Sequence, residues 1–408
     1  MPPSRPAAAR PPATALTRVI GVVACVLGVG LILPVGWGAW RVNAPRHESE
    51  VIARQAAFLD QALAEGAADQ MQALFPEGAY FQITLTALVD AADTSRPVEE
   101  RARLLDEHIA ALDEPAMDAH FAPSDAIFPR GWRLLVLVER LRLVPDADLE
   151  ARVRAECTDI MADVEASPTG VLSSYPGGYW PVDTVVALAA VARADATVGV
   201  DGAAAGIAAW QEKVAPLRDA NGLLVHRTAE DGTPIDSARG SSQSIIQVFW
   251  PDLDPAGAPA EWQRFHAAFV DRQAGLVGVR EYPRGDQRSG DIDSGPLILG
   301  VSASASAVTL GAARRAGALD LARGLDAEAE VLGLGWDTAT HRRYAGGLMP
   351  IGDAFLAWSR TQPLAPAQTD ADGPSPRWWA WALGLGTPGA LALLGGLRLT
   401  FRRRPGVR

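Results

Sequence analysis

The stretch "YPGGYWPVDT", residues 175–184, combines aromatic rings, glycines and a carboxylate within one turn-forming segment. Tyr179 and Trp180 directly precede Pro181, and Asp183 follows two residues later. One interpretation is structural: Pro181 takes the first position of a helix, and Asp183 favours the helix dipole in the first turn. The other is chemical, because exposed rings beside glycines suit a ligand-binding wall that holds a catalytic Asp183. Both interpretations remain open at this point.

The stretch "GDIDSGP", residues 290–296, raises a similar choice. Alternating residues of an extended segment point to one side, so Asp291 and Asp293 could share a pocket. Two carboxylates that close would raise the pKa of one of them, as a general acid requires. A simple turn and a calcium-binding loop are the alternatives.

Other aromatic and polar side chains in the predicted connections suit a sugar, because sugar rings stack on aromatic faces and hydroxyl groups bond to Asp, Arg and His. We expect the substrate-binding residues to be Tyr175, Tyr179, Trp180, His226, Arg227, Arg239, Arg280, Glu281, Tyr282, His341 and Tyr344. The expected catalytic carboxylates are Asp183, Asp291 and Asp293, with Asp353 in reserve. The histidines and arginines have an alternative role, the pairing of surface carboxylates.

Cysteine and histidine spacing predicts neither a metal site nor a cofactor. Cys25 lies in an apolar run, which leaves Cys157 alone in the rest of the chain, so no disulfide or Cys-based metal site is expected there. The six histidines show no spacing such as H-E-x-x-H, which argues against zinc.

The elements that must position these residues are helical. Apolar residues recur at three-and-four spacing throughout residues 46–362. We expect helices near 47–74, 77–92, 96–112, 127–143, 147–165, 182–194, 202–217, 241–250, 258–273, 303–316, 318–332 and 348–361. Short and long connections alternate, and antiparallel neighbours would bring every long connection to the same end. The pattern predicts an all-α fold, an (α/α)6 toroid of six helical hairpins.

The hairpin number, together with "YPGGYWPVDT", "ARGSSQS" (238–244) and "GDIDSGP", resembles the six-hairpin glycosidase-like superfamily. The nearest resemblance is to its membrane-anchored bacterial branch, close to the linalool dehydratase/isomerase-like domains, and it covers residues 46–362. It implies glycoside hydrolysis or, in the linalool branch, dehydration and isomerisation. The linalool branch also implies cysteines in the site, whereas Cys157 lies outside every long connection.

Two apolar runs, 19–40 and 378–397, carry no charged side chain, and each is long enough to cross a hydrocarbon core of roughly 30 Å. The first exceeds the usual core of a signal peptide, and Pro45 would hinder cleavage after it, so we expect a retained anchor. Arginines gather outside both runs without any acid, which predicts cytoplasmic termini at the inner membrane. The expected order is a cytoplasmic tail (1–18), a transmembrane helix (19–40), an extracytoplasmic toroid (46–362), a linker (363–377), a transmembrane helix (378–397) and a basic cytoplasmic tail (398–408).

Charge and site residues together suggest the function. All 48 Asp and Glu residues lie between the two apolar runs, which argues against nucleic acid and against anionic lipid head groups as partners. The leading hypothesis is a membrane-anchored enzyme that hydrolyses a glycan or glycoside with two carboxylates, Asp183 and either Asp291 or Asp293. The alternatives are a lyase or isomerase acting on a small alcohol, and a non-catalytic glycan-binding scaffold. The sequence leaves the oligomeric state open.

Overall fold

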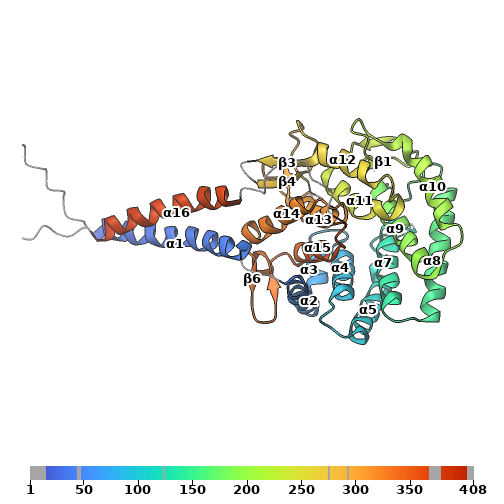
Figure 1. The fold of residues 1–408 in the computed structure, drawn as a ribbon, viewed down its shortest axis with the longest axis horizontal. Helices are drawn as coiled ribbons and strands as arrows, with labels where there is room; N and C mark the ends of the chain where they lie inside the picture. The colour runs from blue at the N-terminus through green and yellow to red at the C-terminus, as the bar shows by residue number, and fades with distance from the viewer. Residues whose placement is uncertain are drawn as a thin grey trace, which may run out of the picture.

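A computed structural model describes residues 15–43, 47–122, 125–273, 276–291, 294–366 and 378–401. These residues form an all-α fold with three small sheets in the connections. Figure 1 shows a ring of helices from which two long helices extend to one side.

Six helices form the inner ring of the toroid. They are α4 (Gly78–Ala92), α7 (Ile127–Leu143), α9 (Pro181–Val198), α11 (Gly240–Leu253), α13 (Ala303–Arg315) and α15 (Pro350–Thr361). Each contacts the next one in this order, and α15 contacts α4, so the ring closes. Inner helices are apolar around most of their circumference: every residue of α9 from Pro181 to Val191 is buried.

The outer ring consists of amphipathic helices that alternate with the inner ones along the chain. They are α2 (Glu48–Ala64), α5 (Val98–Leu112), α8 (Ala147–Ala166), α10 (Ala203–Val214), α12 (Ala258–Phe269) and α14 (Leu319–Leu332). In α5, for example, only Ala102, Leu105, Ile109 and Leu112 are buried. That spacing gives one apolar stripe, which packs on the inner ring while the other faces remain in water. The predicted (α/α)6 toroid is confirmed.

Aromatic side chains fill the centre of the ring. Trp132 of α7 lies 5.7 Å from Phe249 of α11 and 5.7 Å from Trp358 of α15, measured between ring centroids. Because α7, α11 and α15 alternate around the inner ring, these contacts cross its axis. A fourth inner helix, α4, joins this packing through Phe81, whose ring centroid lies 5.1 Å from that of Phe355 of α15. The middle of the toroid is therefore a packed core, and a ligand site must lie at one end.

The long connections lie together at the N-terminal ends of the inner helices. The N–H of Ile127 donates to Ser173 O, and the N–H of Thr228 donates to Tyr179 O. The N–H of Gly240 donates to Glu281 O. These bonds tie together the segments that lead into α7, α9, α11 and α13, as the alternating connection lengths predict.

Short strands and helices brace these connections. The strands are β1 (Arg227–Thr228) with β2 (Pro234–Asp236); β3 (Val270–Gln273), β4 (Leu276–Arg280) and β5 (Val301–Ser302); and β6 (Trp336–Asp337) with β7 (Arg342–Arg343). The remaining short helices are α3 (Ala67–Gln72), α6 (Pro115–Asp118), η1 (Ala215–Leu217) and η2 (Ala345–Gly347). Two expected helices differ from the structure: 47–74 breaks at Gly66, which has a left-handed φ of 91°, and 258–273 ends as strand β3.

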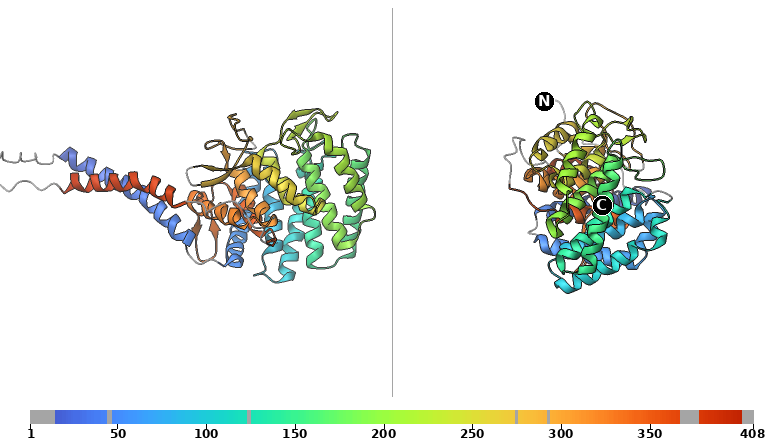
Figure 2. Two further views of the ribbon diagram at one scale, coloured as in Figure 1. Left: turned by 45° about the horizontal axis from the view of Figure 1, so that its top comes forward. Right: turned by 90° about the vertical axis from the view of Figure 1, so that its right-hand side faces the viewer.

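Two helices outside the ring, α1 (Ala15–Asn43) and α16 (Trp378–Thr400), are long and apolar enough to cross a membrane. They run antiparallel and lie against each other (Figure 2), and glycines stand at their contact. A Cβ atom on Gly28 would stand 2.7 Å from Gly389 O, and one on Gly396 would stand 2.5 Å from Gly21 O. Only glycine permits that approach of the two backbones, as at many helix contacts in membranes.

Candidate functional site

Side chains from three long connections meet beside the starts of α9 and α11. We call Trp180, His226, Arg239, Glu281 and Asp291 the rim cluster. The indole Nε1 of Trp180 donates to His226 Nε2 at 3.3 Å, and Arg239 Nη1 lies 3.5 Å from the same nitrogen. Arg239 Nη2 donates to Asp291 Oδ1 at 2.7 Å. The two stretches singled out first from the sequence, around 180 and around 291, therefore share one end of the toroid.

Arg239 is the centre of the rim cluster. Its Nε donates to Glu281 Oε1 at 2.6 Å, and its Nη1 lies 3.8 Å from Asp236 Oδ2. The guanidinium also lies over the ring of Tyr282, 5.2 Å from the centroid. The side chain of Arg239 is only 5 % exposed, so three carboxylates and one aromatic ring replace its water shell.

The segment "ARGSSQS" explains how this arginine is positioned. Glu281 accepts hydrogen bonds from the N–H of Ser241 at 3.1 Å and from its hydroxyl group at 2.8 Å, which caps the start of α11. A Cβ atom at Gly240 would stand 2.0 Å from Arg280 O. Only glycine lets the chain around residue 280 come this close, so Gly240 fixes the spacing between Arg239 and Glu281.

Burial and pairing set the charges of the cluster. Burial by itself would raise the pKa of Asp291, but the hydrogen bond and the charge of Arg239 outweigh it and lower that pKa to about 2. Burial, helped by the charge of Arg239, lowers the pKa of His226 to about 4, so the imidazole is neutral at neutral pH. Burial raises the pKa of Glu281, and the opposing effect of the Arg239 charge does not cancel this rise. Asp291 is thus not the carboxylate of raised pKa that the D-x-D pattern predicts, because an arginine pairs with it; Asp293 lies outside the described residues.

An aromatic wall adjoins the cluster. The rings of Tyr175 and Trp180 meet edge to face at 5.3 Å, and Tyr175 stacks on Phe128 of α7 at 5.8 Å. Arg227 lies over the Trp180 ring, 4.8 Å from its centroid. The Nε of Arg227 is buried and has no hydrogen-bond acceptor among the residues that the structure describes. Tyr179 pairs with strand β1, through the bond from Thr228 N–H to its carbonyl.

Two further candidate carboxylates begin inner helices. Asp183 lies in the first turn of α9, and its N–H donates to Trp180 O at 3.1 Å; the residue is 8 % exposed. Asp353 lies in the first turn of α15 and accepts the N–H of Tyr344 at 2.8 Å. Burial raises the pKa of Asp353 to about 7, the range that a general acid needs at neutral pH. Helices α9 and α15 stand three places apart in the ring of six, so the two carboxylates come from opposite sides.

Three predicted binding residues have other surroundings. Arg280 donates to Asp271 Oδ2 at 3.2 Å and to the carbonyls of Leu299 and Asp286, which holds the connection between β4 and β5 together. Tyr344 is buried, and its hydroxyl group donates to Glu330. His341 lies in the β6–β7 hairpin, where its Nδ1 lies 2.7 Å from Thr340 Oγ1.

Two contributors to the site were not among the predicted residues. Ser242 Oγ lies 2.9 Å from His226 Nδ1 and orients the ring. Arg288 stacks on Tyr282, 4.0 Å from the ring centroid, and its Nη1 donates to Asp236 Oδ1 at 3.1 Å. The paired serines of "ARGSSQS" at a helix start were the available signal for Ser242; nothing local to Arg288 distinguishes it from other loop arginines.

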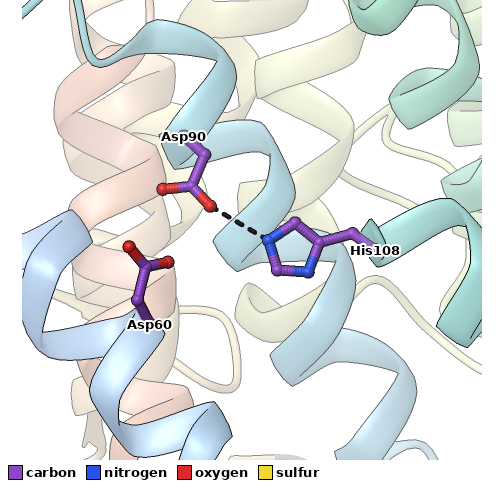
Figure 3. Close-up of side chains that lie close together, drawn as sticks. All are labelled: Asp60, Asp90 and His108. Carbon is purple, nitrogen blue, oxygen red and sulfur yellow. Dashed lines mark hydrogen bonds and ion pairs between the residues drawn. The ribbon is translucent and has the colours of Figure 1, made fainter. Parts of the chain in front are cut away.

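Among the described residues, Asp60, Asp90 and His108 bring three possible metal ligands together (Figure 3). His108 Nε2 lies 3.0 Å from Asp90 Oδ2. Arg96 already bonds both aspartates, Asp60 at 2.6 Å and Asp90 at 3.1 Å. The group is therefore an ion-pair network that joins α2, α4 and α5, and a cation there would compete with a guanidinium.

Comparison with known proteins adds little to this geometry. No protein-family model matches the chain, and no curated protein matches its sequence. One of the similar solved structures is a crystal structure of D-mannose isomerase, at 10 % sequence identity and a TM-score of 0.41, over 92 % of this chain and 98 % of that chain. A likeness this distant supports no conclusion about activity.

Proposed function

We propose that the protein is a membrane-anchored enzyme that hydrolyses a glycan or glycoside at the outer side of the cytoplasmic membrane. The observation that carries the proposal is the rim cluster together with the adjoining Tyr175 and Arg227: aromatic rings, two arginines and carboxylates from separate connections meet at one end of an (α/α)6 toroid. Rings of this kind stack on sugar faces, and charged groups bind sugar hydroxyls.

The carboxylates take different roles because their surroundings differ. Asp291, kept ionised by Arg239, supplies the negative charge that an oxocarbenium-like transition state requires, or orients the attacking water. Asp183, one turn after Trp180, is the proposed acid that protonates the leaving group. Asp353 is the reserve acid, since burial raises its pKa to about 7. Tyr175, Tyr179 and Trp180 form the sugar-stacking wall, and Arg227 donates to substrate oxygens.

One alternative has a specific observation in its favour. A lyase or isomerase needs a base that can take a proton from carbon or oxygen. His226 is neutral because its pKa is about 4, but its Nε2 accepts the Trp180 N–H, so that bond must open before the imidazole acts as the base. The charged surroundings of the rim cluster favour a sugar over a small apolar alcohol as its substrate. Product analysis separates the reactions: hydrolysis releases a new reducing end, whereas isomerisation leaves the mass of the substrate unchanged.

The proposed orientation places both termini in the cytoplasm, on the basis of the arginines that flank the two apolar helices. Alkaline phosphatase fused after residue 200 should be active in a bacterial host, and the same enzyme fused at residue 408 should be silent. The reverse pattern would place the toroid in the cytoplasm and would exclude an envelope glycan as substrate.

A ligand screen tests the proposed substrate class. The full-length protein in detergent would be screened by thermal shift against glycans, glycosides and small alcohols. A glycan hit should bind more weakly to Arg227→Gln than to wild type, because this substitution removes the cation over Trp180. Arg323→Gln is the matched control, since Arg323 is exposed on the outer helix α14. A hit that binds both variants equally would place the ligand elsewhere.

A further inference from the structure

The end of α1 packs into the toroid. Helix α1 contacts α14, and the indole Nε1 of Trp37 donates to Gly335 O at 2.9 Å. A Cβ atom on Gly38 would stand 3.1 Å from Val331 Cα, and one on Gly335 would stand 3.2 Å from Arg41 Nε. Contacts this close, one to the backbone of α14 and one to the Arg41 side chain, fix the position of the helix end.

A buried ion network locks the same contact. We call Glu330, Arg41, Arg342, Arg360 and Tyr344 the Glu330 cluster. Arg41 Nε donates to Glu330 Oε2 at 2.7 Å, Arg360 Nη2 donates to Oε1 at 3.1 Å, and Arg342 donates to the same oxygen. The side chains of Glu330 and Arg41 are 0 % and 2 % exposed. Pulling α1 away would leave Glu330 and its arginines incompletely paired, so the toroid sits at a fixed height on α1.

The height of the membrane boundary follows from the two apolar helices. At about 1.5 Å per residue, residues 19–40 of α1 cover about 33 Å, close to the roughly 30 Å of a hydrocarbon core. Trp37 and Trp40 lie at the toroid end of this run, and Arg18 precedes its other end. Helix α16 runs antiparallel to α1, so residues of its first half lie beside the toroid half of α1: a Cβ atom on Gly386 would stand 3.6 Å from Val35 Cγ1. Tryptophans concentrate at membrane–water interfaces, which places Trp37 at the outer boundary.

Three exposed apolar side chains lie beside this boundary. Leu332, Leu334 and Trp336 are 48 %, 51 % and 53 % exposed, and the Trp336 ring lies 5.6 Å from the Trp37 ring. Figure 1 shows α14 and β6 next to the toroid end of α1. Leu334 has a φ of 49°, a left-handed conformation that glycine or asparagine adopts at lower cost. An exposed leucine in a strained position is explained if its side chain has an apolar environment.

We propose that residues 332–336 dock onto the lipid bilayer that α1 and α16 cross, with Leu332, Leu334 and Trp336 in its interfacial zone. The contact is apolar, which agrees with the acidic character of the chain, because no attraction to anionic head groups is needed. The proposal rests on the membrane anchoring in the proposed function and is independent of the reaction. It means that the toroid is held against the membrane in one orientation and does not swing on a tether.

Spin labels on the reconstituted full-length protein test this contact. Cys25→Ala leaves only the buried Cys157, and single nitroxide labels are then placed by Leu332→Cys and Leu334→Cys. The protein is inserted into phosphatidylcholine vesicles, and power saturation compares collisions with oxygen, which concentrates in lipid, and with a nickel chelate, which stays in water. Leu27→Cys in the apolar run is the lipid control, and Ile235→Cys, 57 % exposed on β2, is the water control.

Labels at 332 and 334 should collide with oxygen more than with nickel, as the label at 27 does and the label at 235 does not. If the labels at 332 and 334 behave like the label at 235 while the label at 27 stays in lipid, the proposed docking is wrong, but the membrane anchoring is still supported. If 27 also behaves like 235, the membrane span itself is wrong. If 332 and 334 are protected from both reagents, a protein such as a second copy covers them, which also overturns the lipid contact.

Discussion

The rim cluster and the Glu330 cluster are inverse arrangements of the same groups. In the rim cluster one arginine, Arg239, pairs with Glu281 and Asp291, and Asp236 lies next to it outside the cluster. In the Glu330 cluster one glutamate is surrounded by three arginines. The two clusters use the same kinds of charged groups but differ in how far their carboxylates are exposed to water. The side chain of Asp291 is 44 % exposed, and that of Glu330 is fully buried.

Exposure determines what each cluster can do. Burial by itself would raise the pKa of Glu330, but the charges of Arg360 and Arg342 and the Tyr344 hydroxyl group outweigh it and hold that pKa at about 2. Every side chain in this cluster bonds a partner inside the protein, although Arg41 Nη2 has no acceptor among the described residues. The rim cluster, in contrast, keeps a charged carboxylate at the surface beside an aromatic wall. A sealed cluster stabilises structure, and an open one is available to a ligand.

The largest expected effect is the loss of the central glutamate charge. Glu330→Gln should lower the free energy of unfolding by about 3–5 kcal/mol, because three buried guanidinium groups then lack their shared counter-charge. Thermal unfolding in detergent measures the change. Asp320→Asn, an exposed carboxylate on the same helix, is the control and should stay within about 1 kcal/mol of wild type. An unchanged Glu330→Gln would mean that the network does not hold α1.

The next effect is a pH dependence from Asp353. Native Asp353 keeps a proton up to a pKa of about 7, whereas the unfolded residue releases it near pH 4. The folded state therefore binds more protons between these values, and the free energy of unfolding falls as pH rises from 4 to 7, by on the order of 2–4 kcal/mol.

The substitution Asp353→Asn should remove this slope, because the amide stays neutral at every pH. The unfolding temperature is followed from pH 4 to pH 8 in a Glu328→Gln background, since burial also raises the pKa of Glu328, to about 8. A slope that is the same with and without the Asp353→Asn substitution would show that Asp353 is ionised in the folded protein.

A smaller loss is expected from the centre of the rim cluster. Arg239→Lys keeps the charge but cannot bond Glu281 and Asp291 together in the fork geometry of arginine. The free energy of unfolding should fall by about 1–2 kcal/mol, less than for Glu330→Gln, because water reaches Asp291. Comparing the unfolding curves of the two variants tests whether exposure, and not the number of ion pairs, sets the loss in the free energy of unfolding. An equal loss for Arg239→Lys and Glu330→Gln would contradict this account.

The smallest effect on stability is expected at the aromatic wall. Tyr179→Phe should change the free energy of unfolding by less than about 0.5 kcal/mol, since the main-chain bond to Thr228 is kept. The same variant should bind a glycan hit more weakly, because a hydroxyl group is lost at the proposed wall. Calorimetric titration would measure the difference, and equal affinities would remove Tyr179 from the site.

The sequence predicts the ring because the spacing of apolar residues in each helix reflects which of its faces are buried. The apolar inner helices and the one-sided outer helices differ in periodicity, and the alternation of connection lengths orders them. The meeting of the 175–184 and 290–296 stretches at one end follows from that order. Asp291 was predicted to share a pocket with Asp293, which lies outside the described residues. In the structure Asp291 pairs with Arg239, 52 positions away along the chain. No local pattern records such a pairing.

The Glu330 cluster was not predicted for the same physical reason. In the sequence, nothing distinguishes Arg41 from other arginines beside an apolar run, or Glu330 from other acidic residues on an amphipathic helix. Their contact spans 289 positions and depends on how α1 packs against α14. Tyr344, which the sequence suggested for substrate binding, belongs to this buried network, because its hydroxyl group bonds Glu330 of α14.

Turnover of a hit glycan by Asp183→Asn, measured together with its unfolding, tests the central claim most directly. Loss of a helix-dipole partner alone should cost about 0.3–1 kcal/mol of stability. Asp148→Asn, in the first turn of the outer helix α8, measures that cost away from the site. If Asp183 is the general acid, its variant should unfold much as Asp148→Asn does, yet turn over roughly 10²–10⁴-fold more slowly. An Asp183→Asn protein as active as wild type would reduce Asp183 to a helix-entrance residue and contradict the proposed mechanism.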